Sequence, residues 1–330
     1  MRAVRLHGVR DLRVEEVPAP APPRPDEVML DVTMAGICGS DLHNFATGAW
    51  ITRAPSVAGH EFTGIVTRTG TGVSHVRAGD AVIVDSRHMC GHCAACAGGL
   101  GQVCESLGFL GEVMDGGFAR AVVLPARNVL PAPEGVAPRH LAMAEPLAVA
   151  LHAMNRLDMP AGAPLVIAGC GPIGALCALL AARAGHEVSL IERNPDRAGL
   201  VAAIAGARVI TADDLKVMRP AHAIDTTGAG AVIALLVARI AGAGRLALVG
   251  IGRPGAAIDP LEEVGREITI LGVHAFADEL PAAGALLAEL APQLDALIAG
   301  PVGLGEVPAA YEALIAGQAP GIKTLIDCQR

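Results

Sequence analysis

The chain has 330 residues, of which 52% are hydrophobic, 18% charged and 2% aromatic, and its formal net charge is −8. This composition is typical of a folded chain long enough for two domains, and it excludes an intrinsically disordered protein. The acidic balance, without a basic stripe, and the scarcity of aromatic side chains exclude the usual nucleic-acid-binding surfaces, so we expect no nucleic-acid partner.

The beginning of the chain carries charges where a secretory signal would be apolar: Arg2, Arg5, Arg10, Asp11 and Arg13. The uncharged stretch 161–182 is long enough to span a membrane, but glycines and a proline interrupt it. We interpret this stretch as a strand, a turn and a helix. We therefore expect a cytoplasmic protein with no membrane partner.

The first ~150 residues are rich in glycine, turns and strand-like runs. Val28, Leu30, Val32 and Met34 alternate with their neighbours and predict a half-buried strand, and residues 62–68 predict another. Cys38 lies just past the first strand, and His60 and Glu61 lie at the start of the second. A single cysteine or histidine in such a place is more often a packed core residue than a ligand.

Four cysteines follow in the pattern C-x2-C-x2-C-x7-C, at Cys90, Cys93, Cys96 and Cys104. Four thiolates so close in sequence suit a tetrahedral structural zinc that has no open position for a substrate. An iron–sulfur cluster is the alternative, but the long final gap and the lack of a proline after Cys104 disfavour it.

Glu145 precedes Pro146, which predicts that this carboxylate lies in the first turn of a helix, where it could also serve simply as a cap. One thiolate, one imidazole and one carboxylate would leave zinc an open fourth position, as in catalytic sites. Zinc in such a site acts as a Lewis acid on a bound alcohol. Cys38, His60 and Glu145 are therefore candidate ligands of a second, catalytic zinc.

Beyond Pro146 the pattern changes to short apolar runs that alternate with helical stretches. Strands are predicted at 165–167, 187–191, 208–210, 223–225, 245–249 and 268–271, with one helix ending at Arg183 and another over 198–205. Strands that alternate with helices predict a parallel sheet and the α/β fold class.

The first of these strands runs into a G-x-G-x-x-G turn, with Gly169, Gly171, Pro172, Ile173 and Gly174, and a predicted helix follows. Such glycines let the backbone approach a pyrophosphate at the helix N-terminus, so the context indicates a dinucleotide. Thr226, Val249 and Gly250 lie at the ends of later predicted strands and are further candidates for cofactor binding.

Glu192 ends the second strand, about 20 residues past the turn. A carboxylate there can accept hydrogen bonds from ribose hydroxyls and would repel a 2′-phosphate, which favours NAD. Arg193 follows it and could receive that phosphate, so NADP remains the less favoured alternative.

Taken in this order, the segments resemble the zinc-containing medium-chain alcohol dehydrogenase family, in its polyol, butanediol and sorbitol dehydrogenase-like branch. The resemblance covers essentially the whole chain. It implies a GroES-like β-rich catalytic domain and a Rossmann domain with a doubly wound parallel sheet. Residues 1–150 and 278–330 would form the first, with a structural zinc lobe at about 88–105, and residues 151–277 the second.

The resemblance also implies roles for single residues. Glu61 would adjoin the metal and could replace Glu145 or a water there during turnover, so the third ligand stays open between the two. Ser40 would take the proton of the alcohol and pass it, through the nicotinamide ribose, toward His43. Asp41 would orient His60. Bacterial relatives suggest a homotetramer, with a homodimer as the alternative.

Two departures bear on the substrate. Asn44 stands where sorbitol dehydrogenases have a tyrosine, and residues 273–276 lack their arginine. We therefore expect NAD-linked, reversible oxidation of another small secondary alcohol, vicinal diol or polyol to its ketone. A zinc-independent NAD(P)H enone or quinone reductase of the same fold, and a non-catalytic nucleotide-binding regulator, are the alternatives.

Overall fold

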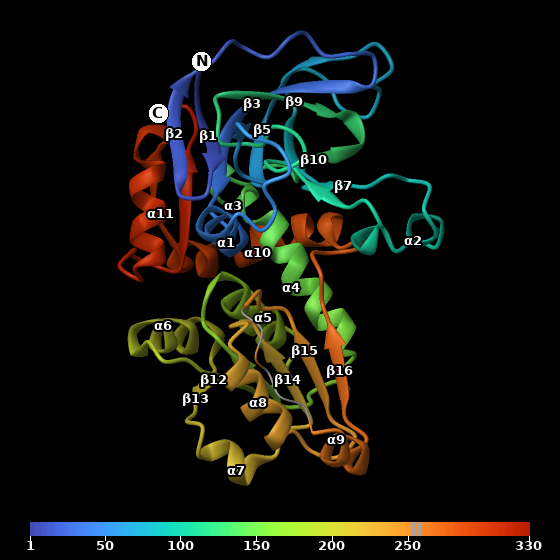
Figure 1. The fold of residues 1–330 in the computed structure, drawn as a ribbon, viewed down its shortest axis with the longest axis vertical. Helices are drawn as coiled ribbons and strands as arrows, with labels where there is room; N and C mark the ends of the chain where they lie inside the picture. The colour runs from blue at the N-terminus through green and yellow to red at the C-terminus, as the bar shows by residue number, and fades with distance from the viewer. Residues whose placement is uncertain (253–254, 256–258) are drawn as a thin grey trace. The chain divides into compact units, whose positions relative to one another are not determined.

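The computed structural model describes residues 1–252, 255 and 259–330. The chain forms two compact units (Figure 1): unit 1 comprises Met1–Glu145 and Leu280–Arg330, and unit 2 comprises Pro146–Glu279. Unit 1 is therefore built from two separate stretches of the chain, whereas unit 2 is continuous.

Unit 1 is rich in antiparallel β-structure. In its described residues, β2-β1-β4 form one sheet, β10-β6-β5-β3-β18-β17 form a larger sheet in which β9 also pairs with β3, and β7-β8 form a short ribbon. Its strands are β1 (Arg2–Gly8), β2 (Asp11–Glu16), β3 (Glu27–Gly36), β4 (Ser56–Val57), β5 (Glu61–Thr69), β6 (Ala81–Val84), β7 (Arg87–His88), β8 (Gly108–Phe109), β9 (Ala121–Pro125), β10 (Val129–Pro131), β17 (Ile298–Gly303) and β18 (Lys323–Asp327).

Helices and 3-10 turns connect these strands. They are α1 (Gly39–Thr47), α2 (Ala94–Ala97), α3 (Pro138–Leu141), α10 (Leu280–Leu297) and α11 (Val307–Ile315), with 3-10 turns at Gly101–Val103, Ala126–Asn128 and Leu304–Glu306. α4 (Ala144–Leu157) begins in unit 1 and continues into unit 2. Glu145 lies in its first turn, as predicted.

The central pairing of unit 1 is between β3 and β5, which run antiparallel. The predicted alternation is confirmed at Val28, Leu30 and Val32, which are all fully buried, whereas Met34 is half-buried. On its other side β3 pairs with β18, where Leu325 lies opposite Gly36. Because of this pairing, a strand that follows unit 2 in the sequence lies beside the segment that ends at Cys38.

Unit 2 contains the predicted parallel sheet, in the order β13-β12-β11-β14-β15-β16 among its described residues. Numbered within the unit this order is 3-2-1-4-5-6, that of the doubly wound dinucleotide-binding fold. Its strands are β11 (Leu165–Ala168), β12 (Val188–Ile191), β13 (Arg208–Val209), β14 (His222–Asp225), β15 (Arg245–Leu248) and β16 (Thr269–Gly272). Its helices are α5 (Pro172–Arg183), α6 (Pro195–Ala205), α7 (Asp214–Met218), α8 (Gly230–Arg239) and α9 (Pro260–Arg266).

The uncharged stretch 161–182 forms β11, a turn and α5, which confirms the strand–turn–helix prediction. α5 packs its residues 174–181 into the interior, so this run is apolar because it is buried within the unit. Among the described residues, no helix has the length and apolar character that crossing a membrane requires.

Candidate functional site

The candidate catalytic site begins where β3 leads into α1. Cys38 is the residue that caps α1, and its backbone N–H donates to the Asp41 carboxylate at 2.9 Å. Ser40, Asp41 and His43 therefore lie in the first turns of a helix that starts at the candidate ligand Cys38. Gly48, in a left-handed conformation with φ of 72°, ends this helix.

His60 is buried, and its Nδ1 lies 3.2 Å from the second oxygen of Asp41. One carboxylate thus holds both the Cys38 backbone and the His60 ring, as metal-bound histidines generally require. Burial lowers the pKa of His60, but the negative charges of Asp41 and Cys38 outweigh burial and raise it well above its ordinary value. The negative charges of Asp41 and Cys38 therefore stabilise a positive charge at this site.

Glu61 has a partner that the sequence did not reveal. Lys323, the first residue of β18, forms an ion pair with its carboxylate, and both side chains are 1% exposed. The Lys323 ammonium also donates to the Ile37 carbonyl at 3.0 Å. A side chain at Gly36 would clash with both members of the pair, so this glycine leaves them room.

Cys38, His60 and Glu61 present donor atoms that all lie within 4.8 Å of one another. Donors bound to one tetrahedral zinc at about 2.0–2.3 Å lie roughly 3.3–3.8 Å apart, so small side-chain adjustments bring these three to a common ion. Thiolate, imidazole and carboxylate are also the donor types of catalytic zinc. These residues fit the implied metal.

Glu145, the other candidate third ligand, is not part of that group of three. Its Oε1 accepts a hydrogen bond of 2.8 Å from the Ser86 hydroxyl, and both residues are buried. Burial raises the pKa of Glu145 to about 7, and the nearby charge of Glu61 adds to the rise. Glu145 therefore lies within electrostatic reach of the cluster.

A third glutamate, Glu112, is close enough to His60 to interact with it electrostatically, and it was not predicted. It lines a cavity of about 20 Å³, together with Asp41, Asn44 and Tyr311. That volume is about what one water needs. Burial raises the pKa of Glu112 to about 7, and the charge of Asp41 acts in the same direction.

Two aromatic rings lie close to histidines of the candidate site. The Trp50 ring lies 5.0 Å from that of His43, and the Phe109 ring lies 6.2 Å from that of His60. Ser40 and His43 are half-buried. The Phe109 ring is therefore near the candidate ligand His60, and the Trp50 ring is near the candidate proton carrier His43.

The four lobe cysteines converge as predicted, because all four Sγ atoms lie within 4.8 Å of one another. The Cys90–Cys104, Cys93–Cys104 and Cys90–Cys96 sulfurs are 3.5, 3.9 and 4.0 Å apart. Sulfurs bound to one zinc at about 2.3 Å would lie roughly 3.8 Å apart, so this set fits a tetrahedral ion. Hydrogen bonds from the backbone lower the pKa of Cys93 to about 6, whereas burial raises the pKa of Cys96 to about 12, so the fit to zinc rests on the sulfur distances.

The predicted dinucleotide turn joins β11 to α5 in unit 2. Gly169 has φ of +98°, and a side chain at Gly174 would overlap the Gly169 carbonyl, so both positions need glycine. Gly171 caps α5 and faces open space, which leaves room for a phosphate to approach the backbone. Pro172 and Ile173 form the first turn of the helix, and both are half-buried.

The later candidates gather beside this turn. The Thr226 hydroxyl donates to the Ala168 carbonyl at 2.9 Å, and Val249 and Gly250 both donate their N–H groups to the Asp225 carbonyl. The carboxyl ends of β11, β14 and β15 therefore meet at one edge, where such sheets bind nucleotides.

Glu192 reaches back from the end of β12 to the same turn. Its two oxygens accept backbone hydrogen bonds from Cys170 at 2.7 Å and from Asn194 at 2.9 Å. The carboxylate is therefore held beside the glycine turn, while Arg193 is exposed.

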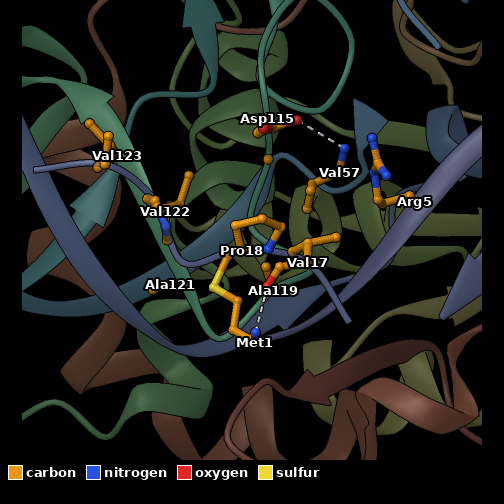
Figure 2. Close-up of a pocket in the computed structure, with 13 residues that line it drawn as sticks. Met1, Arg5, Val17, Pro18, Val57, Asp115, Ala119, Ala121, Val122 and Val123 are labelled. Carbon is orange, nitrogen blue, oxygen red and sulfur yellow. Dashed lines mark hydrogen bonds between the residues drawn. The ribbon is translucent and has the colours of Figure 1, made fainter. Parts of the chain in front are cut away.

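A cavity of about 400 Å³ lies elsewhere in unit 1, lined by Met1, Arg5, Val17, Pro18 and Asp115 among others (Figure 2). None of the predicted site residues lines this cavity. Its charged groups are already paired, because Arg5 contacts Glu15 and Asp115 contacts Arg53. We therefore assign it no role in the predicted reaction.

Comparison with known proteins identifies the family. The alcohol dehydrogenase GroES-like domain family matches residues 24–134. A 2-dehydro-3-deoxy-L-galactonate 5-dehydrogenase from Pseudoalteromonas atlantica is 32% identical, with 99% of each chain covered. The chain belongs to the zinc-containing medium-chain alcohol dehydrogenase family, and it is an NAD(P)-linked oxidoreductase that acts on small alcohols. The predicted GroES-like and Rossmann fold class is confirmed.

Solved structures agree over nearly the whole chain. A 2R,3R-butanediol dehydrogenase from Bacillus subtilis is 28% identical with a TM-score of 0.89, covering 99% of each chain. A zinc-binding dehydrogenase from Sinorhizobium meliloti bound to NADP is 28% identical with a TM-score of 0.91, covering 99% of this chain and 98% of that one. RspB from Escherichia coli with NADH is 27% identical with a TM-score of 0.90, covering 99% of each.

Proposed function

We propose that this enzyme oxidises a neutral secondary alcohol, vicinal diol or polyol to the ketone, with NAD as the hydride acceptor. The observation that carries the proposal is the convergence of Cys38, His60 and Glu61 donors within 4.8 Å, next to the helix that bears Ser40 and His43. In the forward direction the carbinol carbon loses a hydride to the nicotinamide, and its hydroxyl loses a proton. The products are the ketone, NADH and a proton.

We assign unit 1 as the catalytic domain and unit 2 as the cofactor domain, close to the division expected from the sequence. Cys38 and His60 would hold the catalytic zinc with Glu145 as third ligand, and the four lobe cysteines would hold the structural zinc. Bound zinc supplies a Lewis acid for the substrate oxygen.

Glu61 is assigned a supporting role beside the metal. Its charge is compensated by Lys323, whereas the side chain that holds Glu145 is a neutral hydroxyl and brings no compensating charge. Ser40 would accept the proton of the alcohol and His43 would carry it onward.

We infer a preference for NAD over NADP from Glu192. Its carboxylate, held beside the glycine turn, would repel a 2′-phosphate. Exposed Arg193 is the residue that could offset this repulsion, and the S. meliloti protein is a relative whose structure is bound to NADP. Comparing kcat/KM for NAD and NADP in the wild type and in Glu192→Ala tests this assignment.

We infer a neutral substrate from the charges around the metal candidates. In the described part of unit 1, two cationic groups influence the pKa values of the site residues His60, Glu112 and Glu145. One is His60 itself, and the other is Lys323. Lys323 is already paired with Glu61. This region of unit 1 thus favours hydroxyl groups over a carboxylate or a phosphate on the substrate.

We also propose a cytoplasmic homotetramer, with a homodimer as the alternative. β16 forms an outer edge of the described sheet in unit 2 and could pair with the same strand of another copy. All eight cysteines are free, as suits a reducing compartment. Light scattering of the purified protein and cell fractionation test the two statements.

The deciding experiment measures NADH formation by zinc-loaded protein with vicinal diols, polyols, simple secondary alcohols and a sugar acid. Cys38→Ala removes a proposed ligand, and Cys328→Ala is its matched control. In the described residues that buried thiol hydrogen-bonds backbone carbonyls, and it belongs to the hydrophobic core of unit 1. Turnover of neutral substrates that persists in the control and vanishes in Cys38→Ala supports the proposal. Turnover that survives Cys38→Ala, or is confined to the sugar acid, contradicts it.

A further inference from the structure

Ser86 is a buried residue for which the expected reaction has no role. It connects β6 to β7, is 0% exposed, and uses its hydroxyl on Glu145 at 2.8 Å. A serine hydroxyl has one proton to donate, and an ionised carboxylate can only accept. The direction of this hydrogen bond is therefore from Ser86 to Glu145.

The backbone on either side of Ser86 is held rigidly. The side-chain amide of Asn128, which is 2% exposed, donates at 2.7 Å to the carbonyls of both Asp85 and Arg87. The Ser86 carbonyl itself accepts from the Leu110 N–H at 2.9 Å. Since three consecutive carbonyls are fixed, the Ser86 hydroxyl is presented to Glu145 in a defined place.

This hydrogen bond occupies one oxygen of Glu145 and leaves the other available. In the described residues, no second side chain hydrogen-bonds Glu145. Glu61 differs, because the Lys323 ammonium binds its carboxylate and compensates its charge. A neutral hydroxyl orients a carboxylate without compensating its charge, so Glu145 can offer its negative charge to a metal ion.

We propose that Ser86 is a positioning residue for the catalytic zinc: it holds Oε1 of Glu145 and so leaves Oε2 as the oxygen that would bind the metal. The inference rests on the proposed function, in which Glu145 is the third ligand. Hydrogen bonds to metal-binding side chains typically contribute 10–100-fold to metal affinity. Ser86→Ala should therefore bind the catalytic zinc about 10–100-fold more weakly than the wild type.

The test measures zinc affinity, independently of turnover, by competition with a chromophoric chelator on the full-length protein. Ser86→Thr retains the hydroxyl and should restore affinity to nearly the wild-type value. Ser56→Ala is the matched control, because the Ser56 hydroxyl is equally buried and donates at 2.8 Å to the Gly111 carbonyl instead. Ser56→Ala should leave zinc affinity unchanged.

Two further measurements separate positioning from general destabilisation. With Co²⁺ in the catalytic site, the visible absorption bands should shift in Ser86→Ala and stay unchanged in Ser56→Ala. In a Glu145→Ala background, Ser86→Ala should cause no further loss of zinc affinity, because the two residues act as one unit.

Wild-type affinity and an unshifted cobalt spectrum in Ser86→Ala would overturn the inference, as would an equal loss in the Glu145→Ala background. These outcomes are distinct from failure of the proposed function. A wild type that binds zinc through Cys38 yet oxidises no alcohol would contradict the function and leave the affinity measurements interpretable.

Discussion

Replacing Lys323 by methionine removes the charge of a buried ion pair while keeping a side chain of similar length. Lys323 and Glu61 are each 1% exposed, so the variant leaves the Glu61 carboxylate buried without its partner. Removing one member of such a pair costs about 3–5 kcal/mol. We expect the free energy of unfolding of unit 1 to fall by about that amount at neutral pH in metal-free protein, and by less with zinc, because a dication also compensates Glu61.

The chain provides its own probe for this measurement. Trp50 is the single tryptophan and lies in unit 1, so its fluorescence in urea follows that unit. Adding Glu61→Gln to Lys323→Met should recover most of the loss, because no unpaired charge then remains. Arg13→Met, which breaks an exposed pair with Asp11 in unit 1, serves as the control and should change little. A loss below about 1 kcal/mol, with no recovery in the double variant, would refute the reasoning.

Two other perturbations test the rest of the site. Cys96→Ser should lower the zinc content by one ion per chain and lower the melting temperature. His92→Ala, at an exposed position of the same lobe, should change neither quantity. A zinc content that metal analysis finds unchanged in Cys96→Ser would contradict a structural zinc bound by the four cysteines. Because burial raises the pKa of Glu112 from 4.5 to about 7, the stability linked to its protonated form is present at low pH and is lost as the pH rises through 7. Glu112→Gln should therefore reduce the fall in stability of metal-free protein between pH 5.5 and 8, by about 1–3 kcal/mol, and parallel urea midpoints in the two proteins would exclude this.

Unit 2 was predictable because its signals are local. Each strand, turn and helix of the nucleotide-binding half is encoded within a few neighbouring residues, and the parallel order follows from their alternation. The error at α6 is one of boundary: it begins at Pro195, three residues before the predicted start, because the Asn194 side chain accepts from Asp196 and Arg197 and caps it. The sequence Asn-Pro could have indicated this start.

The end of the chain was harder to interpret. α10 extends over Leu280–Leu297 although Pro292 lies inside it, and no helix was predicted there. Its seven buried positions stabilise it by packing, which outweighs the unfavourable helix propensity of its glycine and proline.

The residues of the candidate site likewise fall into those that local sequence motifs predict and those that only the fold brings together. Cys38, His60 and the four lobe cysteines stand in short motifs, so their types and spacings were sufficient to find them. Lys323 is 262 residues from Glu61, and only the β3–β18 pairing brings the two together. A lone lysine in the apolar run 322–326 was the available signal, since such a residue in a buried strand needs a counter-charge. Nothing in the sequence around Ser86 indicates its contact with Glu145.

The pairing of β18 with β3 has a consequence for the order in which the protein is made. A ribosome completes the first part of unit 1, with Cys38, His60 and Glu61, before it synthesises any of unit 2. At about 5–20 residues per second, roughly 10–40 s separate Glu145 from Lys323. During that interval unit 2 can fold alone, because it is continuous in sequence. Glu61 lacks its ion-pair partner until Lys323 has been synthesised. The metal centre therefore reaches its full electrostatic balance only after the nucleotide-binding unit has emerged.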